Sequence, residues 1–165
     1  MVLIAREASA ESLEGVGLFI TPSRGQSPEA GAEFSFELAA PDLGMPAGLC
    51  AGSLDCVSRP MMLARMERHL RTPEMLSAVD GDAIVCVAPS QEPRGGTITG
   101  LRAIRMRRGQ AIVLATGAWH WIPFPTGTAS VRFLVVFRAE TGDDDLYFCD
   151  LADHAAIEIP QGVTI

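Results

Sequence analysis

Charged side chains are scarce in this sequence of 165 residues: they make up 20% of it, and the formal net charge is −7. A negatively charged protein repels nucleic acid and anionic lipid, so we expect neither as a partner. One local group of basic residues stands against this balance, at Arg102, Arg105, Arg107 and Arg108. Strand alternation would divide these arginines between two faces, which favours a solvated strand end, although a local anion pocket stays open as an alternative.

Long apolar runs and paired cysteine motifs are missing as well. No run approaches the ~20 apolar residues of a membrane span, and the sequence turns polar directly after Met-Val-Leu-Ile-Ala-Arg. The four cysteines, Cys50, Cys56, Cys86 and Cys149, form no C-x-x-C pair. Two of them lie in apolar runs typical of core strands, so we expect buried thiols and a cytoplasmic protein.

Helix signals and internal repeats are also rare. Residues 9–14 begin with a serine cap and end at Gly15, which predicts one short surface helix. We find no internal repeat. With 48% hydrophobic residues the chain can bury a sizeable core, and its length suits a single domain over residues 1–165.

What the sequence contains instead is a series of short apolar segments separated by clusters of Gly, Pro and Asp. The predicted strands are 63–69, 83–88, 100–106, 111–115, 131–137 and 146–151, with an edge strand at 33–38. Residues 41–52 and 123–127 are predicted to be loops. This spacing without intervening helices indicates an all-β antiparallel sandwich or barrel. Its predicted core includes Ile84, Val85, Val87, Leu101, Ile104, Ile112, Leu114, Phe133, Val135 and Val136.

The segment Glu67-Arg68-His69 is the first candidate for a functional site. Alternation places Glu67 and His69 on the same face of a strand, and Glu74 and Gly81 follow at the spacing E-x-H-x4-E-x6-G. This pattern resembles the first cupin motif, H-x-H-x3-4-E-x6-G, with Glu67 in place of the first histidine.

A second candidate segment, Gly117-Ala118-Trp119-His120, resembles the second cupin motif, G-x5-P-x-G-x2-H, in which a glycine turn aims a histidine into the barrel mouth. Gly109 precedes it, and Ala115 stands where the motif has proline. Both tryptophans of the chain flank His120, which favours a walled pocket over open solvent. His154 has no such surroundings and is predicted to lie on the surface.

Together these segments predict that two carboxylates and two imidazoles converge, at Glu67, His69, Glu74 and His120. Such a set can hold divalent iron, manganese, nickel or zinc. Two alternatives stay open. The site can be free of metal, with Glu74 and the histidines moving protons directly, and His69 can be an ordinary hydrogen-bonded structural residue.

Further segments resemble the ureidoglycolate lyase family. Residues 63–69 (L-A-R-M-E-R-H) are similar to the family's L-E-R-H, 84–89 (I-V-C-V-A-P) to V-V-V-A-P, 101–104 (L-R-A-I) to L-R-A-F, 109–110 to G-Q, 117–120 (G-A-W-H) to G-V-W-H, and 133–138 (F-L-V-V-F-R) to F-L-V-V-D-R. Residues 9–20 are similar to the family's opening helix and strand. The resemblance is good over 63–138 and poor over 21–62.

This resemblance implies a cupin-like double-stranded β-helix, or jelly-roll barrel, that forms a homodimer and splits ureidoglycolate into glyoxylate and urea in allantoin breakdown, a part of purine metabolism. Such a carbon–nitrogen lyase needs a base, an acid and a grip on the substrate carboxylate. His69, Glu74 and His120 would be the catalytic residues. Arg138 or a backbone amide would hold the carboxylate, and Trp119, Trp121 and Phe137 would complete the substrate-binding site.

Three departures from the family pattern leave the substrate open. Trp121 replaces the second histidine of W-H-H, Phe137 replaces the aspartate of F-L-V-V-D-R, and Glu74 stands where the family often has glutamine. The rim loses two polar groups and the site gains a carboxylate, which suits metal binding. The enzyme could therefore act on a related 2-hydroxy or 2-oxo acid. Alternatives are a metal-dependent cupin with other chemistry, such as an isomerase or dioxygenase, and a non-catalytic small-molecule-binding domain.

Overall fold

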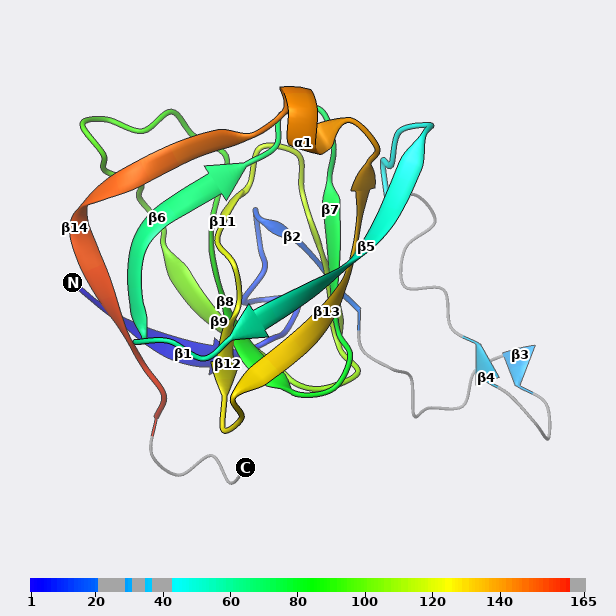
Figure 1. The fold of residues 1–165 in the computed structure, drawn as a ribbon, viewed down its shortest axis with the longest axis horizontal. Coiled ribbons are helices and arrows are strands. Elements are labelled where there is room, and N and C mark those ends of the chain that lie inside the picture. The colour runs from blue at the N-terminus through cyan, green and yellow to red at the C-terminus, as the bar shows by residue number, and fades with distance from the viewer. Residues whose placement is uncertain (21–28, 31–34, 37–42, 161–165) are drawn as a thin grey trace.

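The computed structural model of the protein describes residues 1–20, 29–30, 35–36 and 43–160. These residues form a β-barrel with one short helix (Figure 1). In chain order the elements are β1 (Val2–Glu7), β2 (Gly17–Ile20), β3 (Glu29–Ala30), β4 (Ser35–Phe36), β5 (Leu49–Val57), β6 (Met62–Arg68), β7 (Glu74–Ala78), β8 (Asp82–Ala88), β9 (Arg102–Met106), β10 (Ala111–Leu114), β11 (Trp119–His120), β12 (Phe124–Thr126), β13 (Ser130–Arg138), α1 (Thr141–Asp144) and β14 (Tyr147–Glu158). The all-β barrel predicted from the sequence is confirmed.

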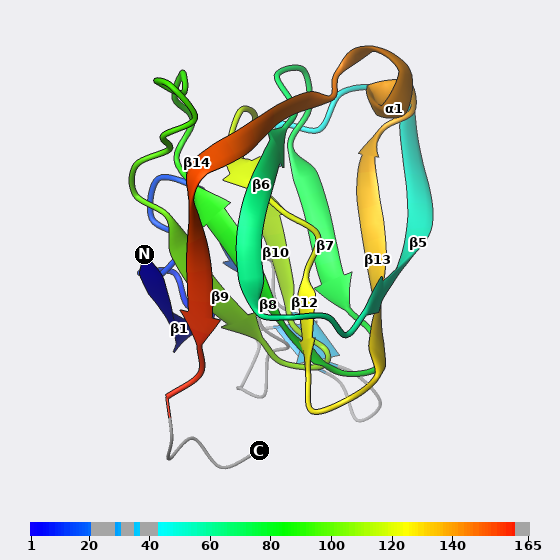
Figure 2. The same cartoon turned by 60° about the vertical axis from the view of Figure 1, so that its left-hand side comes forward.

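Seven strands form one sheet in the order β11-β6-β14-β1-β9-β8-β12. The short strand β11 pairs with β8 as well as with β6, which joins two otherwise distant strands of this sheet. Because of this extra pairing the sheet curls around on itself, as the view in Figure 2 shows. His120 lies at this closure, opposite Glu67 on one side and Val87 on the other.

Five strands form the second sheet, in the order β2-β10-β7-β13-β5, and all its pairings are antiparallel. Strands β13 and β5, of nine residues each, are the longest in it and pair along their whole length. Since β5 stands at the edge, its second side has no strand partner in the described part of the chain. β3 and β4 pair with each other apart from both sheets.

Strand β8 separates two hydrophobic cores, because its side chains are buried on both faces. Val85 and Val87 face the core between the two sheets, while Ile84 and Cys86 face the core enclosed by the seven-stranded sheet. This explains why the segment is an unbroken apolar run rather than an alternating one. Most residues of the predicted core are buried. The exceptions are Leu101, which is partly buried, and Val136, which lies on the other face of β13 from Val135.

Several local predictions were wrong. Residues 10–16 form successive turns instead of a helix, although Ser9 and Ser12 do make the reciprocal backbone-to-hydroxyl hydrogen bonds of a helix start. Part of the predicted loop 41–52 belongs to β5, and part of the loop 123–127 forms β12. Of the predicted edge strand 33–38, the described residues Ser35–Phe36 pair as β4, and the rest lies outside the described residues.

The cysteines and arginines take largely structural places. Cys56, Cys86 and Cys149 are buried, Cys50 is partly buried, and all four are unpaired. Three of the four arginines at 102–108 bind protein groups: Arg105 and Arg107 pair with Glu7 and Asp82, and Arg102 donates to backbone carbonyls, while Arg108 is exposed. Among the residues that the structure describes, no helix has the length and apolarity to cross a membrane.

Candidate active site

The end of strand β6 supplies the first two polar groups of the site. Glu67 is the second-last residue of the strand, and His69 directly follows its end. Because the two residues are two positions apart, both side chains line the same cavity. His120 comes from β11 and faces Glu67 across the strand pair, with 3.7 Å between His120 Nε2 and Glu67 Oε1.

A glycine turn fixes the approach of His120. Gly117 has a φ of +82°, a conformation that glycine adopts without steric cost, and a Cβ there would collide with the Ser90 side chain. The N–H of Gly117 donates to the carbonyl of His69 at 2.6 Å. The turn therefore ties the two histidine-bearing segments together through the backbone.

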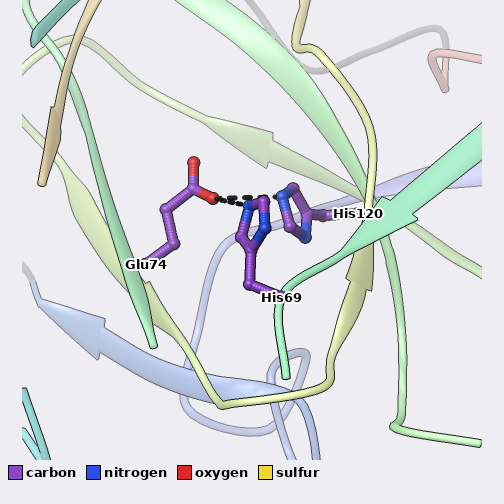
Figure 3. Close-up of side chains that lie close together, drawn as sticks. All are labelled: His69, Glu74 and His120. Atoms are coloured by element: carbon purple, nitrogen blue, oxygen red, sulfur yellow. Dashed lines mark hydrogen bonds and ion pairs between the residues drawn. The ribbon is translucent and has the colours of Figure 1, made fainter. Parts of the chain in front are cut away.

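Glu74 reaches the histidines from the other sheet. It is the first residue of β7, and its Oε2 lies 2.8 Å from His69 Nε2 and 3.1 Å from His120 Nε2 (Figure 3). The two imidazole rings are 5.0 Å apart between centroids. All three residues are buried. A single carboxylate oxygen thus stands between two imidazole nitrogens in an interior where charge interactions are strong.

Hydrogen bonds of the rings fix which nitrogen carries a hydrogen. His69 Nδ1 lies 2.9 Å from the carbonyl oxygen of Asp145, and His120 Nδ1 lies 3.1 Å from that of Ala118. A carbonyl only accepts, so both Nδ1 atoms must donate. In the neutral rings, both Nε2 atoms then point their lone pairs toward the Glu74 carboxylate. Three electron-rich atoms converge, and a cation between them, either a proton or a metal ion, would relieve their repulsion.

When no metal is bound, the proton of the cluster lies on His120, and Glu74 is ionised. Burial lowers the pKa of His120. The nearby carboxylates of Glu74 and Glu67 raise this pKa by more than burial lowers it, and the result is a pKa of about 9. Burial raises the pKa of Glu74, but His120 and His69 lower it more strongly, to about 2. Burial also raises the pKa of Glu67. Without metal, the cluster at neutral pH contains a buried imidazolium beside a buried carboxylate.

The same atoms fit a divalent metal ion. His69, Glu74 and His120 each offer one ligand atom, and these atoms lie within 4.8 Å of one another. His120 Nε2 is buried and has no hydrogen-bond partner, although it lies 3.1 Å from Glu74 Oε2. Both Nδ1 atoms donate to backbone carbonyls, the usual support of metal-binding histidines. Two imidazoles and a carboxylate suit zinc, iron, manganese or nickel.

The cavity beside this cluster has a volume of about 380 Å³ and extends between the two sheets. Its polar end consists of Glu67, His69, Glu74 and His120. Its walls are mainly apolar, and the residues that form them are Leu54, Leu76, Trp121, Ile122, Pro123, Val135, Phe137 and Leu146, with Gly52, Ser53, Thr141 and Gly142 between them. Trp121 and Phe137, predicted as substrate-binding residues, both line this cavity.

Arg138 and Trp119, also predicted as substrate-binding residues, do not line the cavity. Arg138 forms ion pairs with Glu140 and Asp144, because β13 ends there and its side chain turns to the α1 segment. Trp119 alternates with His120 along β11 and therefore packs in the other core, with its indole N–H on the carbonyl of Gln91. Arg138, predicted to hold the substrate carboxylate, is instead paired with Glu140 and Asp144.

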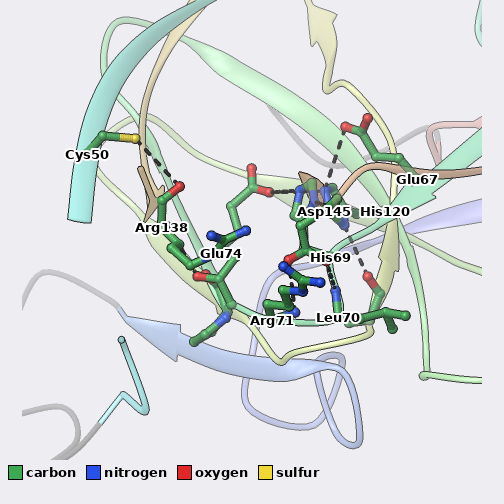
Figure 4. A network of polar contacts seen from close by, with 12 residues as sticks. Cys50, Glu67, His69, Leu70, Arg71, Glu74, His120, Arg138 and Asp145 are labelled. Carbon is green, nitrogen blue, oxygen red and sulfur yellow. Dashed lines mark hydrogen bonds and ion pairs between the residues drawn. The ribbon is translucent and has the colours of Figure 1, made fainter. Parts of the chain in front are cut away.

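Asp145 is the residue of the site that the sequence did not indicate. It is fully buried, its two carboxylate oxygens accept the N–H groups of Leu70 and Arg71, and its own carbonyl accepts from His69 (Figure 4). Its position in the acidic run Asp143-Asp144-Asp145 looks like a solvated turn, and no sequence signal separates the three. Only the fold brings this aspartate to the histidine.

In a comparison with known protein families, residues 39–158 match a family model described as ureidoglycolate lyase. That segment contains Glu67, His69, Glu74 and His120, and also the Asp145 support. Among curated proteins, no match was found.

The solved structures that resemble the chain are distant in sequence. An oxalate decarboxylase has 17% identity and a TM-score of 0.43, with 63% of this chain and 24% of that chain covered. A structure of the Bacillus subtilis oxalate decarboxylase, studied for its Mn(II) centers, has 16% identity and a TM-score of 0.42 with the same coverage. RmlC from Streptococcus suis, in complex with dTDP-D-xylose, has 10% identity, a TM-score of 0.42 and coverage of 62% and 55%. The chain spans about a quarter of the oxalate decarboxylase and about half of RmlC.

Proposed function

Because the chain belongs to the ureidoglycolate lyase family, we propose that it is a carbon–nitrogen lyase that cleaves ureidoglycolate, or a related small 2-hydroxy acid derivative, at the carbinol carbon. The observation that carries this proposal is the convergence of Glu67, His69, Glu74 and His120 on one cavity. Proton-transfer groups at the end of a walled cavity are what such a cleavage requires.

The reaction needs one proton to move from oxygen to nitrogen. The hydroxyl of ureidoglycolate loses its proton, the C–N bond breaks as the aldehyde of glyoxylate forms, and the leaving nitrogen of urea takes up a proton. Glu67 is suited to accept the hydroxyl proton, since its carboxylate faces the cavity and is the least enclosed of the four groups. In a site free of metal, His120 is suited to protonate the nitrogen. Its Nε2 lies 3.7 Å from Glu67 Oε1, so the proton returns from Glu67 through one bridging water.

In this arrangement Glu74 acts as an anchor. Its single oxygen between the two histidines holds both rings toward the cavity. If His69, Glu74 and His120 hold a divalent ion, that ion supplies Lewis-acid polarisation of the substrate oxygens. The role of Glu67 as proton acceptor is the same with or without metal.

The test combines elemental analysis of the purified protein with an assay for glyoxylate released from ureidoglycolate. We expect release by the wild type and a loss of at least a hundredfold in kcat in Glu67→Gln, which keeps the shape of the side chain but cannot accept the proton. Glu158→Gln, on the exposed end of β14, is the control. Bound metal without glyoxylate release would point to other metal-dependent chemistry, and neither metal nor release would point to a binding protein.

A further inference from the structure

The cavity has two ends of opposite character, and the proposed reaction uses only one of them. At the polar end, the four ionisable residues Glu67, His69, Glu74 and His120 meet. Away from them the wall consists of apolar side chains, among them Trp121, Ile122, Phe137 and Leu146. A site this shape accommodates a ligand with one polar head and one apolar tail.

The charges around the cavity exclude a second charged group on the ligand. No arginine is among the described lining residues. The neighbouring arginines are occupied: Arg138 by Glu140 and Asp144, and Arg68 by Glu92 and the carbonyl of Gln91. A second carboxylate at the apolar end would thus meet no cation, while desolvation would cost several kcal/mol. The tail must be uncharged.

Hydrogen-bonding groups in the wall are few. Ser53 and Thr141 supply the side-chain hydroxyls, and the Thr141 hydroxyl is buried with no hydrogen-bond partner. These two hydroxyls can satisfy only a few polar atoms of a ligand. A ureido group carries three polar atoms, two nitrogens and an oxygen, so it fits the polar end, where its leaving nitrogen meets His120, better than the wall at Phe137 and Trp121.

We infer that this site takes small 2-hydroxy or 2-oxo acids whose substituent is an apolar chain, with the acid at the histidine–glutamate cluster and the chain along Trp121, Ile122, Phe137 and Leu146. This inference rests on the proposed function, because it assigns the acid end to the same cluster. It extends the ligands of the site from the ureido compounds of the proposed reaction to acids with hydrocarbon tails, which have no leaving nitrogen and bind without C–N cleavage. The volume of about 380 Å³ leaves room for such a tail.

The experiment is a calorimetric titration of the manganese-loaded and the metal-free protein with glyoxylate, pyruvate, 2-oxobutanoate, 2-oxopentanoate and 2-oxohexanoate. Each added methylene should lower Kd about fourfold, which corresponds to ~0.8 kcal/mol of apolar transfer. The 2-oxo acids cannot be cleaved as ureidoglycolate is, so binding is measured apart from turnover.

Two leucines provide matched variants, since Leu146 and Leu134 are equally exposed, at 42%. Leu146 lines the cavity, whereas Leu134 lies on the outer face of β13. Leu146→Ser and Ile122→Ser should flatten the dependence of Kd on chain length, and Leu134→Ser should leave it unchanged. Both cavity positions are partly exposed, so the variants are expected to fold.

The inference is overturned if Kd stays constant or rises with chain length, if no 2-oxo acid binds, or if Leu134→Ser has the same effect as Leu146→Ser. Failure of the proposed function gives a different result, namely no glyoxylate from ureidoglycolate. A protein that binds 2-oxohexanoate tightly but does not cleave ureidoglycolate would support the substrate class and reject that reaction.

Discussion

His120 combines more roles than any other residue of the site. It pairs two strands through its backbone, faces Glu67 and Glu74 through Nε2, and donates through Nδ1 to Ala118. Among the described ring nitrogens of the cluster, its Nε2 is the one that is buried without a hydrogen-bond partner, so it is the atom with the most to gain from a metal ion.

We therefore expect His120→Ala to abolish metal binding and any lyase activity together, with a drop in metal affinity of at least a hundredfold. Metal content by elemental analysis and glyoxylate release check this. His154→Ala is the control, because that histidine is exposed on β14. If His120→Ala retained both metal and activity, the cluster would not be the site.

The pairing of Glu74 with His120 predicts how the stability of the metal-free protein depends on pH. The folded-state pKa of His120 is raised from 6.5 to about 9, so its contribution is full below 6.5 and is lost as pH rises through 9. The folded-state pKa of Glu74 is lowered from 4.5 to about 2, so its contribution is full above 4.5 and is lost as pH falls to 2. The raised folded-state pKa of Glu67 adds a loss of stability that begins as pH rises above 4.5.

Urea denaturation of chelator-treated protein should thus give a maximum free energy of unfolding between pH 4.5 and 6.5, with losses on the order of 2–3 kcal/mol on either side. In His120→Gln, the alkaline loss should shrink. A wild-type curve that rises from pH 6.5 to 9 would contradict the assigned charges.

Asp145 holds His69 without touching the cavity, which makes it a positioning residue. Asp145→Ala leaves the N–H groups of Leu70 and Arg71 without partners, at a cost of about 1–3 kcal/mol each. We expect a lower midpoint in thermal unfolding and weaker metal binding. Asp144→Ala is the matched neighbour, because it removes only exposed ion pairs and should cost less than about 1 kcal/mol. Equal effects of the two changes would refute the positioning role.

Among the elements of the fold, the glycine turn before β11 tolerates little change. Gly117→Ala forces a left-handed residue and a collision with Ser90, whereas Gly127→Ala, at a φ of +76° in open space, imposes the backbone strain alone. We expect Gly127→Ala to destabilise by about 1–2 kcal/mol and Gly117→Ala by more, with loss of metal binding in the latter. Thermal unfolding measures both. Adding Ser90→Gly should recover part of the Gly117→Ala loss, and no recovery would show that the collision is not the cause.

The strands that could be predicted from the sequence are those whose own pattern of apolar and polar residues specifies which side chains are buried. Residues 83–88 and 131–137 are apolar or alternate, and both form strands with small shifts of their ends. It failed where tertiary pairing overrides local preference: the glycine-containing β5 and the proline-containing β12 are strands because a long neighbour supplies their hydrogen bonds. For the site, period and spacing singled out the four ionisable residues that line the cavity. Arg138 and Asp145 could not be placed, because their positions depend on how the α1 segment packs.

At the scale of the whole molecule, the edge of the five-stranded sheet predicts self-association. β5 is nine residues long, carries only Asp55 as a charged residue, and exposes Leu49 and Val57 at 48% and 65%. Long edge strands with little charge tend to pair with another chain. We expect light scattering to give twice 17.6 kDa, and Ala51→Lys, which places charges across a two-fold edge pairing, to give the monomer. Val79→Lys, exposed elsewhere, should remain dimeric. A monomeric wild type would contradict this prediction.

The two histidines extend from the seven-stranded sheet, whereas Glu74 begins a strand of the five-stranded sheet. The polar cluster therefore links the two sheets of the barrel, and a cation bound in it would strengthen this link. Separation of the two sheets requires that the contacts of Glu74 with the two histidines break. Occupancy of the site by a cation should accordingly slow amide hydrogen exchange in β6 and β7 together, although these two strands are not paired with each other. The cation at the centre would then also control how often the two sheets open.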